Sequence, residues 1–380
     1  MKVVFTGGGT GGHFYPLIAV AEALKDIAEG RRLLPPQLYY FSDTPYDEQA
    51  LFANNLIFVK IPAGKVRRYF SIQNATDIFK TLTGTVSAFF TLLKLYPDVV
   101  FSKGGYASVP TVLAAHLLRI PIIVHESDAK PGRANLFAAK YATRIGVAFD
   151  SAAQYFPSKT RSKIARTGIP VRKEVAHIER EGAHQLLGLD ADIPTILILG
   201  GSSGSKRINE TVLDALPDLV AFANVIHQTG KTLFAETEQT SKVILTGSEH
   251  ANRYHAFPYL NAESIRRSAG AADLVISRAG ATSITEISLW GKPAILIPIP
   301  ESVSHDQRTN AYAYAHTGAA VVLEEDNLTP HVLASEAKRI GADPVLRSEM
   351  GAKSASFGNA DAAQVIADEI TRIGLSHQAS

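Results

Sequence analysis

Hydrophobic residues in this chain gather in short runs of strand length, and longer segments with helical spacing separate these runs. This alternation is typical of βαβ units, in which helices connect neighbouring strands of a parallel sheet. The longer segments predict helices at residues 17–28, 77–95, 111–118 and 208–216. The short runs predict strands at residues 3–6, 38–41, 57–61, 99–101 and 122–124, and again at 195–199, 225–227, 274–276, 294–297 and 320–323.

Two segments of the chain resemble each other. Residues 2–13 (KVVFTGGGTGGH) and residues 195–206 (TILILGGSSGSK) each consist of an apolar run, a glycine-rich turn and a helix start. We therefore expect an α/β protein with two Rossmann-like, doubly wound domains, at residues 1–166 and 167–345. We expect a hinge at residues 167–172, and an amphipathic last helix, at about residues 357–376, that packs back on the first domain.

Composition narrows the class of protein. The chain has 380 residues, 46% of them hydrophobic, which excludes wholesale disorder and fits two or three domains. It contains no cysteine, which excludes disulfides, zinc–thiolate sites and a cysteine nucleophile. Its net charge of +2 does not indicate nucleic-acid binding. With no export signal and no uninterrupted apolar run of about 20 residues, we expect a cytoplasmic protein that can still associate with a surface.

Three glycine-rich turns are candidates for phosphate binding. They lie at residues 7–12, 103–108 and 200–204, each between a predicted strand and a predicted helix. Such a turn lets backbone approach a phosphate, and the helix N-terminus adds free N–H groups. The alternative for each is a tight strand–helix connection without a ligand. None is a P-loop, and one nicotinamide site does not explain the second turn. Together they predict one crevice for more than one phosphorylated group.

Six segments together resemble one family. They carry the glycine turns, the sequence HESDAKPGRAN and the sequence SRAGATSITE, at residues 8–16, 103–108, 125–135, 167–172, 200–204 and 277–286. In order and spacing they resemble the bacterial peptidoglycan glycosyltransferases that form lipid II, the undecaprenyldiphospho-muramoylpentapeptide β-N-acetylglucosaminyltransferases. The resemblance implies a GT-B fold, with two Rossmann-like domains facing a central cleft. It also implies UDP-N-acetylglucosamine as donor and lipid I as acceptor.

The implied reaction is an inverting displacement of UDP by the muramoyl 4-hydroxyl, and it needs a base. His13 is the leading candidate, because it lies at a helix N-terminus and titrates near neutral pH; the helix dipole favours its neutral form. Asp128 and Glu126 are reserve bases. The alternative for His13 is a cap or phosphate contact. The family usually has Gln-Asn where this chain has Ser127-Asp128, and an aspartate cannot donate amide hydrogen bonds.

The resemblance assigns the donor to a second set of residues. Glu286 matches the ribose contact, Arg172 a diphosphate contact and Pro258 the uracil contact. The alternative for Glu286 is a glutamate on a helix surface, and the alternative for Arg172 is an interdomain salt bridge. The other matched donor positions are Thr10, Gly11, Gly12, Asp128, Asn135, Ser202, Ala281, Thr282, Ser283, Ile284, Thr285 and Gln307, and the acceptor or phosphate loop is Gly104, Gly105 and Tyr106.

No cofactor is expected. The motif Asp190-Ala191-Asp192 fits the Asp-x-Asp pattern of metal-dependent sugar transferases, but it precedes the strand at 195–199 and lies at the wrong end of the sheet. A polar turn is the better interpretation. Glycine loops, helix dipoles and Arg172 can neutralise the diphosphate, so we predict that no divalent metal is required.

One segment of the sequence has features of a membrane-binding surface. Residues 65–70 are basic and aromatic, and in the next helix the residues Ile78, Leu82, Val86, Phe89, Phe90 and Leu93 recur near helical spacing, with Lys80 and Lys94. Periodicity alone favours a core-packing helix. The lipid-linked acceptor implied by the resemblance favours an interfacial helix on anionic lipid. We expect a peripheral protein at the cytoplasmic face of the cell membrane.

The expected partners are therefore UDP-N-acetylglucosamine, lipid I, the anionic inner-membrane surface and other cell-wall synthesis proteins, and not nucleic acid. Other functions stay open at this point. They are a related GT-B enzyme with another lipid acceptor, a UDP-sugar epimerase, a non-catalytic UDP-sugar-binding subunit and, more distantly, a nicotinamide oxidoreductase.

Overall fold

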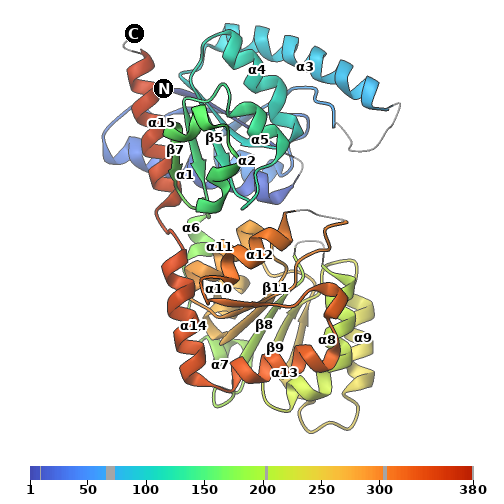
Figure 1. Ribbon diagram of the computed structural model, residues 1–380. Helices are drawn as coiled ribbons and strands as arrows, with labels where there is room; N and C mark the ends of the chain where they lie inside the picture. Colours follow the sequence, from blue (N-terminus) through green and yellow to red (C-terminus); the bar gives the residue numbers. More distant parts are fainter. Residues whose placement is uncertain (9, 66–72, 202–203, 303–305, 379–380) are drawn as a thin grey trace. The chain divides into compact units, whose positions relative to one another are not determined.

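The computed structural model describes residues 1–8, 10–65, 73–201, 204–302 and 306–378, with residues 73–75 and 378 as backbone only (Figure 1). The chain divides into two compact units. Unit 1 comprises Met1–Arg172 and Ala360–Ser380, and unit 2 comprises Lys173–Asn359. These divisions fall later in the chain than residues 166 and 345, where the sequence placed them.

Within its described residues, unit 1 contains a seven-stranded parallel sheet with the order β3-β2-β1-β4-β5-β6-β7. The order reverses between β1 and β4, which is the position where doubly wound sheets bind ligands. The strands are β1 (Lys2–Gly7), β2 (Gln37–Ser42), β3 (Leu56–Lys60), β4 (Val99–Gly104), β5 (Ile122–Glu126), β6 (Arg144–Val147) and β7 (Ile164–Arg166).

Helices cover both faces of this sheet. They are α1 (Gly11–Gly30), α2 (Glu48–Ala53), α3 (Gln73–Leu95), α4 (Val109–Leu117), α5 (Arg133–Ala138) and α15 (Ala362–Gln378), with short 3-10 turns η1 (Tyr106–Ser108), η2 (Asp150–Tyr155) and η3 (Ser158–Lys163). Side chains of a strand alternate between faces, so Val3 and Phe5 pack toward α1 and α15, whereas Val4 packs toward α3 and α4. The sheet is therefore buried on both sides.

The last helix, α15, completes one of these two cores. Ile366, Ala367, Ile370 and Ile373 are buried in the same cluster as α1. Their spacing places them on one helical face, and burial of each isoleucine stabilises the fold by about 1.5–3 kcal/mol. Arg31 pairs with Asp368 at 2.5 Å and Arg144 with Glu369 at 3.0 Å along the margins of the helix. The C-terminal helix is thus an integral part of unit 1.

Unit 2 repeats the topology of unit 1. Its described residues form a six-stranded parallel sheet with the order β10-β9-β8-β11-β12-β13. The strands are β8 (Thr195–Leu199), β9 (Asn224–Gln228), β10 (Tyr254–Phe257), β11 (Leu274–Ser277), β12 (Ala294–Leu296) and β13 (Ala320–Val322). The helices are α6 (Lys173–Ala176), α7 (Ala183–Leu187), α8 (Lys206–Val220), α9 (Phe234–Ile244), α10 (Ala262–Ala271), α11 (Ala281–Trp290), α12 (Gln307–Ala315), α13 (Pro330–Gly341) and α14 (Pro344–Phe357), with 3-10 turns η4 (Ala251–Arg253) and η5 (Glu325–Asn327).

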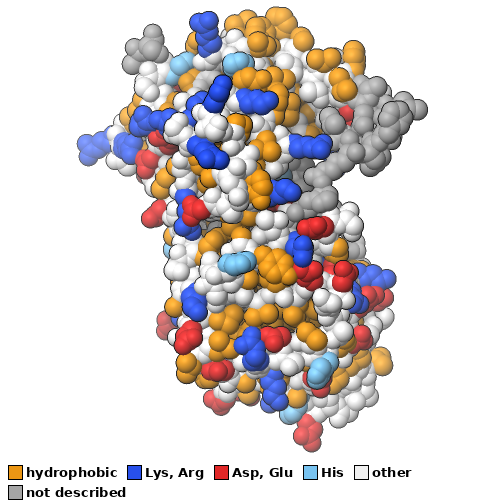
Figure 2. Space-filling view, in the orientation of Figure 1, with side chains coloured by type: hydrophobic (Ala, Val, Ile, Leu, Met, Phe, Trp, Pro, Cys, Tyr) orange, Lys and Arg blue, Asp and Glu red, His pale blue; other side chains and the backbone are white. Residues whose placement is uncertain are grey.

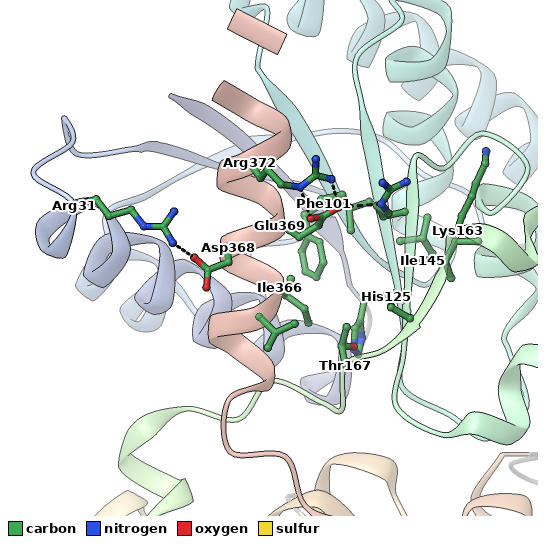
Figure 3. A pocket seen from close by; sticks show the side chains of 16 residues that line it. Arg31, Phe101, His125, Ile145, Lys163, Thr167, Ile366, Asp368, Glu369 and Arg372 are labelled. Carbon is green, nitrogen blue, oxygen red and sulfur yellow. Dashed lines mark hydrogen bonds and ion pairs between the residues drawn. The ribbon is translucent and has the colours of Figure 1, made fainter. Parts of the chain in front are cut away.

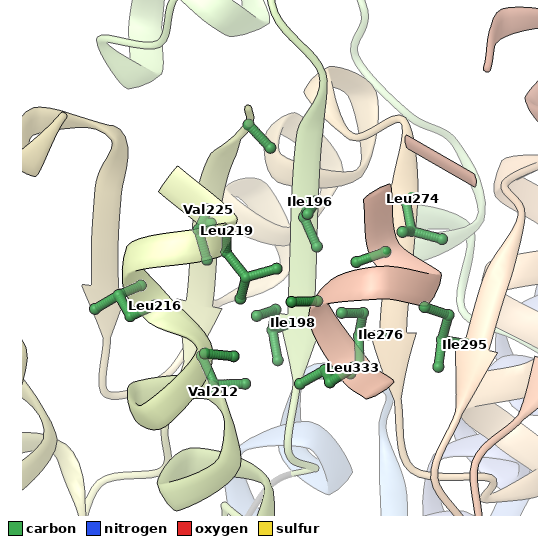
Figure 4. Close-up of a cluster of buried hydrophobic side chains, with 14 of the residues drawn as sticks. Ile196, Ile198, Val212, Leu216, Leu219, Val225, Leu274, Ile276, Ile295 and Leu333 are labelled. Carbon is green, nitrogen blue, oxygen red and sulfur yellow. The ribbon is translucent and has the colours of Figure 1, made fainter. Parts of the chain in front are cut away.

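The core of unit 2 lies between its sheet and helices α8 and α13 (Figure 4). Ile196 and Ile198 of β8 point into it, as do Val212 and Leu216 of α8 and Leu333 of α13. The α8 residues recur at helical spacing, which predicted this helix from the sequence. Consecutive β8 residues are all buried, which explains why the strand has an unbroken apolar run.

The helix α3 differs from the other long helices of unit 1. It packs against α4 through Ala88 and Leu92, but Phe79, Leu82 and Phe90 on its other face are 68%, 60% and 64% exposed. Figure 2 shows hydrophobic side chains gathered at the top of the view, in the region of this helix. Residues Thr76–Leu95 also have the length and composition of a membrane-crossing helix, although polar residues interrupt them.

Candidate active site

The carboxyl edge of the unit 1 sheet brings three loops together. Gly104 and Gly105, after β4, have φ angles of 89° and 77°, a conformation that favours glycine. A Cβ atom on Gly105 would lie 2.9 Å from the carbonyl oxygen of Gly8, and one on Gly104 would lie 2.5 Å from Oδ1 of Asn135. The turns after β1 and β4 and the helix after β5 are therefore in close contact, and larger residues would push them apart.

His13 lies in the first turn of α1, directly after the first glycine loop. Its Nδ1 is hydrogen-bonded to Oγ1 of Thr10 at 2.8 Å, and its backbone N–H donates to the Thr10 carbonyl. Burial, and then the positive charge of Lys103, lower the pKa of His13 to about 4. The imidazole is therefore neutral at physiological pH. In the tautomer whose Nδ1–H donates to Thr10, Nε2 is the nitrogen that can accept a proton.

Glu126, at the end of β5, organises the next loop. Its carboxylate accepts hydrogen bonds from the backbone N–H groups of Asp128 (2.9 Å) and Gly132 (3.0 Å) and from Nδ2 of Asn135 (2.9 Å). Burial raises the pKa of Glu126, and these N–H groups together with Lys103 oppose that rise. Glu126 and Asn135 are therefore buried and hold the backbone of this loop through hydrogen bonds, whereas Asp128 is half-buried.

Lys103, the penultimate residue of β4, is the main site residue to which sequence reasoning gave no role. It is 1% exposed, and its Nζ donates to Oγ of Ser127. Burial lowers its pKa to about 8, although the carboxylates of Glu126 and Asp128 oppose the shift. A charged residue that ends an otherwise apolar strand is the signal that could have revealed it.

His125 lies beneath this cluster. Its Nε2 is 2.8 Å from the carbonyl oxygen of Gly168, and it is fully buried. Burial, followed by the charge of Lys103, holds the pKa of His125 well below its usual range. This histidine is a neutral internal group that ties β5 to the segment after β7.

Two aromatic residues complete the unit 1 edge. The hydroxyl of Tyr106 donates to Oδ2 of Asp43 at 2.6 Å, and burial, assisted by that bond, raises the pKa of Tyr106 to about 12. The guanidinium carbon of Arg172 lies 4.4 Å from the centre of the Tyr15 ring, in α1. Arg172 therefore lies against Tyr15, which follows His13 by two residues in α1, and it places a positive charge at this edge of unit 1.

In unit 2 two side chains hold Gly201 and Ser205, on either side of the undescribed part of the second glycine loop. Arg278, after β11, donates to Oγ of Ser205 at 2.7 Å and pairs with Glu325 at 2.8 Å. Ser205 is the N-cap of α8 and accepts from the N–H of Ile208. Gln228, at the end of β9, donates to the carbonyl of Gly201 at 3.1 Å. Neither Arg278 nor Gln228 was assigned an individual role from the sequence, because each joins elements that are distant in the chain.

The predicted nucleotide residues lie at the start of α11. Gly280 is its N-cap, Ala281, Ile284 and Thr285 are buried, and Thr282, Ser283 and Glu286 are half-buried, as is Pro258 after β10. Oε1 of Gln307 accepts from the N–H groups of Ala279 and Ile299, both at 3.2 Å. An anion or a ribose can therefore meet free helix N–H groups and a carboxylate at this end of unit 2.

Some predicted residues lie outside the described residues. These are Ser202 in the second glycine loop and residues 66–70 of the basic aromatic segment. Asp190 and Asp192 form a turn at the amino end of β8, where the Asp190 carboxylate accepts the N–H of Asp192 at 3.0 Å. Among the described residues, no three His, Asp or Glu side chains are grouped so that they could hold a metal ion.

A separate cavity of about 650 Å³ lies in unit 1 between α15 and strands of the sheet (Figure 3). Its walls include Phe101, Ile145 and Ile366, and His125 lies at its inner end. The charged groups on its rim already have partners, since Arg372 and Arg144 both bind Glu369. The cavity includes none of the residues predicted to bind donor or acceptor, so we do not place substrate there.

Comparisons with known proteins agree with this arrangement. Residues 3–147 match the glycosyltransferase family 28 N-terminal domain, and residues 195–366 match the glycosyltransferase family 28 C-terminal domain. These matches, with the two doubly wound sheets, define a glycosyltransferase of the GT-B class, and the fold class predicted from the sequence is confirmed.

Individual relatives narrow the class. The chain is 36% identical, over 376 residues and 96% of both chains, to a protein of Treponema denticola named UDP-N-acetylglucosamine–N-acetylmuramyl-(pentapeptide) pyrophosphoryl-undecaprenol N-acetylglucosamine transferase. The crystal structure of Acinetobacter baumannii MurG is 28% identical, with a TM-score of 0.75, over 98% of this chain and 99% of that one. A putative UDP-N-acetylglucosamine 2-epimerase from Listeria monocytogenes, 14% identical with a TM-score of 0.69 over 96% and 94% of the two chains, shares the fold alone.

The chain belongs to glycosyltransferase family 28 and, within it, to the family of the pyrophosphoryl-undecaprenol N-acetylglucosamine transferases. The family resemblance inferred from the six sequence segments is thereby confirmed.

Proposed function

We propose that this protein transfers N-acetylglucosamine from UDP-N-acetylglucosamine to the muramoyl 4-hydroxyl of lipid I and so forms lipid II for peptidoglycan synthesis. The observation that carries the proposal is the 36% identity over 96% of both chains to a relative of that name. The neutral histidine of unit 1 and the nucleotide residues of unit 2 are the groups that this reaction needs.

In the proposed mechanism His13 is the base. Its Nδ1 is held by Thr10, so Nε2 accepts the proton of the 4-hydroxyl as the oxygen attacks the anomeric carbon. The bond from that carbon to the diphosphate oxygen breaks, and its electron pair leaves with UDP. Attack opposite the leaving group inverts the anomeric centre. Asp128 and Glu126 remain reserve bases, although Glu126 already accepts three N–H groups.

The proposed donor contacts are provided mainly by unit 2. The carboxylate of Glu286 accepts from the ribose hydroxyls, and the N-terminus of α11 meets the diphosphate. Arg172 adds a positive charge that stabilises the departing UDP. We infer that these groups suffice without a divalent metal. Transfer that stops on addition of EDTA and returns with magnesium would contradict this inference.

We also propose that α3 lies on the cytoplasmic surface of an anionic membrane. Its exposed apolar face includes Ile78, Phe79, Leu82, Val86 and Phe90, and the ammonium of Lys80 lies on the same exposed part of the helix. The opposite face packs on α4, which favours a helix that lies in the interface rather than one that crosses the bilayer.

Co-sedimentation with vesicles containing anionic phospholipid tests this surface. The triple variant Phe79→Ser, Leu82→Ser, Phe90→Ser should bind vesicles roughly 10- to 100-fold more weakly, because it loses much of the buried apolar area. The matched control is Val243→Ser, since Val243 is 74% exposed on α9 in unit 2. Equal binding of the wild type and the triple variant would exclude α3 as the membrane surface.

The function itself is tested with radiolabelled UDP-N-acetylglucosamine and a lipid I analogue. The wild-type protein should form labelled disaccharide product only when the acceptor is present. Donor binding without transfer would indicate a non-catalytic binding subunit, and absence of product from folded protein would overturn the proposal.

A further inference from the structure

Lys103 stands out in unit 1 because an ammonium group is buried where the glycine loops meet. Its side chain is 1% exposed and is among the largest fully buried side chains of the described residues. Its Cβ is close enough to Gly7 that a Cβ there would lie only 3.1 Å away. The side chain thus starts beside the loop after β1 and ends at Ser127, after β5.

Burying a lysine without compensation is unfavourable, so its surroundings should explain its presence. Two carboxylates do so. The charges of Glu126 and Asp128 both act on Lys103 and favour its protonated form, and Ser127 accepts a hydrogen bond from its Nζ. Glu126 in turn holds the backbone of Asp128 and Gly132. Lys103 therefore closes a network that fixes the backbone of residues 126–132.

The network also includes both residues of the Ser127-Asp128 pair. An aspartate in place of asparagine adds one negative charge to a loop that already contains buried Glu126. The hydroxyl of Ser127 gives Nζ of Lys103 an acceptor. The positive charge of Lys103 and the negative charge of Asp128 thus balance each other.

We propose that Lys103 is a positioning residue for the transfer reaction, because it ties the loop after β5 to β4 and balances the charge of Asp128. This inference rests on the proposed function. Lys103 does not contact the reacting atoms; it acts through the loop and through His13. The other charged or titratable groups that face it are Glu126, Asp128, His125 and His13.

The consequence for His13 has a definite sign. The ammonium of Lys103 disfavours a second positive charge on the imidazole, so it keeps His13 neutral. Removal of the ammonium should raise the pKa of His13 and move the acidic limb of the rate profile to higher pH. A merely structural lysine would change the unfolding temperature and leave this limb unchanged.

A double-mutant cycle tests the proposal with Lys103→Met, Asp128→Asn and the double variant. Lys103→Met alone should lower kcat roughly 10- to 100-fold, since it leaves two carboxylates without their cation. In the Asp128→Asn background the same substitution should cost about tenfold less, because one of the two unbalanced carboxylates is gone. The double variant also supplies folded protein if Lys103→Met alone does not fold.

The matched control is Lys292→Met in unit 2. Lys292 is 9% exposed, donates to the carbonyl of Ala272, and has a pKa that burial lowers to about 8. It lies just before β12, at the amino end of the strand and away from the glycine loops. Its replacement should lower the unfolding temperature and leave kcat and the pH profile unchanged.

Two readouts do not depend on transfer. The pKa of His13, measured by NMR, should rise in Lys103→Met, and the unfolding temperatures of the four proteins should show the same coupling between positions 103 and 128. An unchanged His13 pKa, or additive effects of the two substitutions, would overturn the role of Lys103. If the wild-type protein has no transfer activity but the variants still show both effects, the proposed function is overturned and the role of Lys103 in the network is retained.

Discussion

The carboxyl edges of the two sheets share a topology but differ in chemistry. In unit 1 the loops bury Lys103, Glu126 and His125, and the pKa of each is shifted by burial. In unit 2 the corresponding edge is held by the amides of Gln228 and Gln307 and by an Arg278–Glu325 ion pair that remains partly exposed.

The difference indicates how one fold can serve two tasks. Buried charged groups shift the pKa values of their neighbours, which suits an edge where a proton is transferred. Neutral amides and a helix N-terminus bind an anion or a sugar without changing protonation, which suits an edge that holds a nucleotide. We therefore propose that proton transfer belongs to unit 1 and nucleotide binding to unit 2, and the predictions below test that proposal.

The largest expected effect is at His13. His13→Ala should lower kcat by about 10²–10⁴-fold and change the KM for UDP-N-acetylglucosamine little, because a general base acts in the transition state. Steady-state transfer assays measure both constants.

His227 of unit 2 is the control for this prediction. It is fully buried, its pKa is lowered to about 3 by burial, and it is hydrogen-bonded to Tyr254 and Asn209 within the core. His227→Gln should lower the unfolding temperature and retain the kcat of the folded protein. If His13→Ala keeps full turnover, the base lies elsewhere, and Asp128 becomes the next candidate.

A smaller effect is expected at Glu286. Glu286→Gln should raise the KM for UDP-N-acetylglucosamine about tenfold and retain most of kcat, since a neutral amide accepts less strongly from the ribose hydroxyls. The change should disappear for a donor analogue without ribose hydroxyls. A fall in kcat at unchanged KM would show that unit 2 also takes part in the chemical step.

The smallest effect is expected between pH 7 and pH 5. With a His13 pKa of about 4, kcat should fall less than about twofold over this range and then fall tenfold per pH unit below about pH 4. An acidic limb near pH 6.5 would mean that the pKa of the titrating histidine is not lowered.

The free energy of unfolding should also decrease as the pH falls, so it must be measured alongside kcat. His13 and His227 are neutral in the folded state and have lowered pKa values, so the unfolded chain binds more protons below about pH 6.5. Their contribution to the free energy of unfolding is complete above that pH and decreases as the pH falls toward 4. Thermal denaturation at each pH separates this loss from the loss of kcat.

Much of the fold was predictable from local pattern. The buried strands β1 and β8 are continuous apolar runs followed by glycine, and both were predicted. The strands β6, β7 and β10 were not predicted, because they are short and carry polar residues such as Arg144 and His255. Two of these, β7 and β10, are edge strands with one neighbour, so the pattern of complete burial is missing.

The sequence suggested candidate site residues where the relevant chemistry is local in the chain. His13 and the glycine loops became candidates because the residues that define them are neighbours in the sequence, and their roles stay predictions. Lys103 and Arg278 were not, since their partners Ser127 and Glu325 lie 24 and 47 residues away. Periodicity also could not decide whether the α3 stripe is buried, because a core helix and a surface helix can have the same spacing.

The contribution of α15 to unit 1 has a consequence for synthesis on the ribosome. Unit 2 is one continuous segment, Lys173–Asn359, and can complete its core as soon as it emerges. Unit 1 is made first, yet the apolar face of α1 stays uncovered until Ile366 and Ile370 are translated. At 5–20 residues per second that interval is roughly 10–40 s. The earlier half of the chain therefore finishes folding last, and a nascent chain stalled before Ala360 would present that face to chaperones.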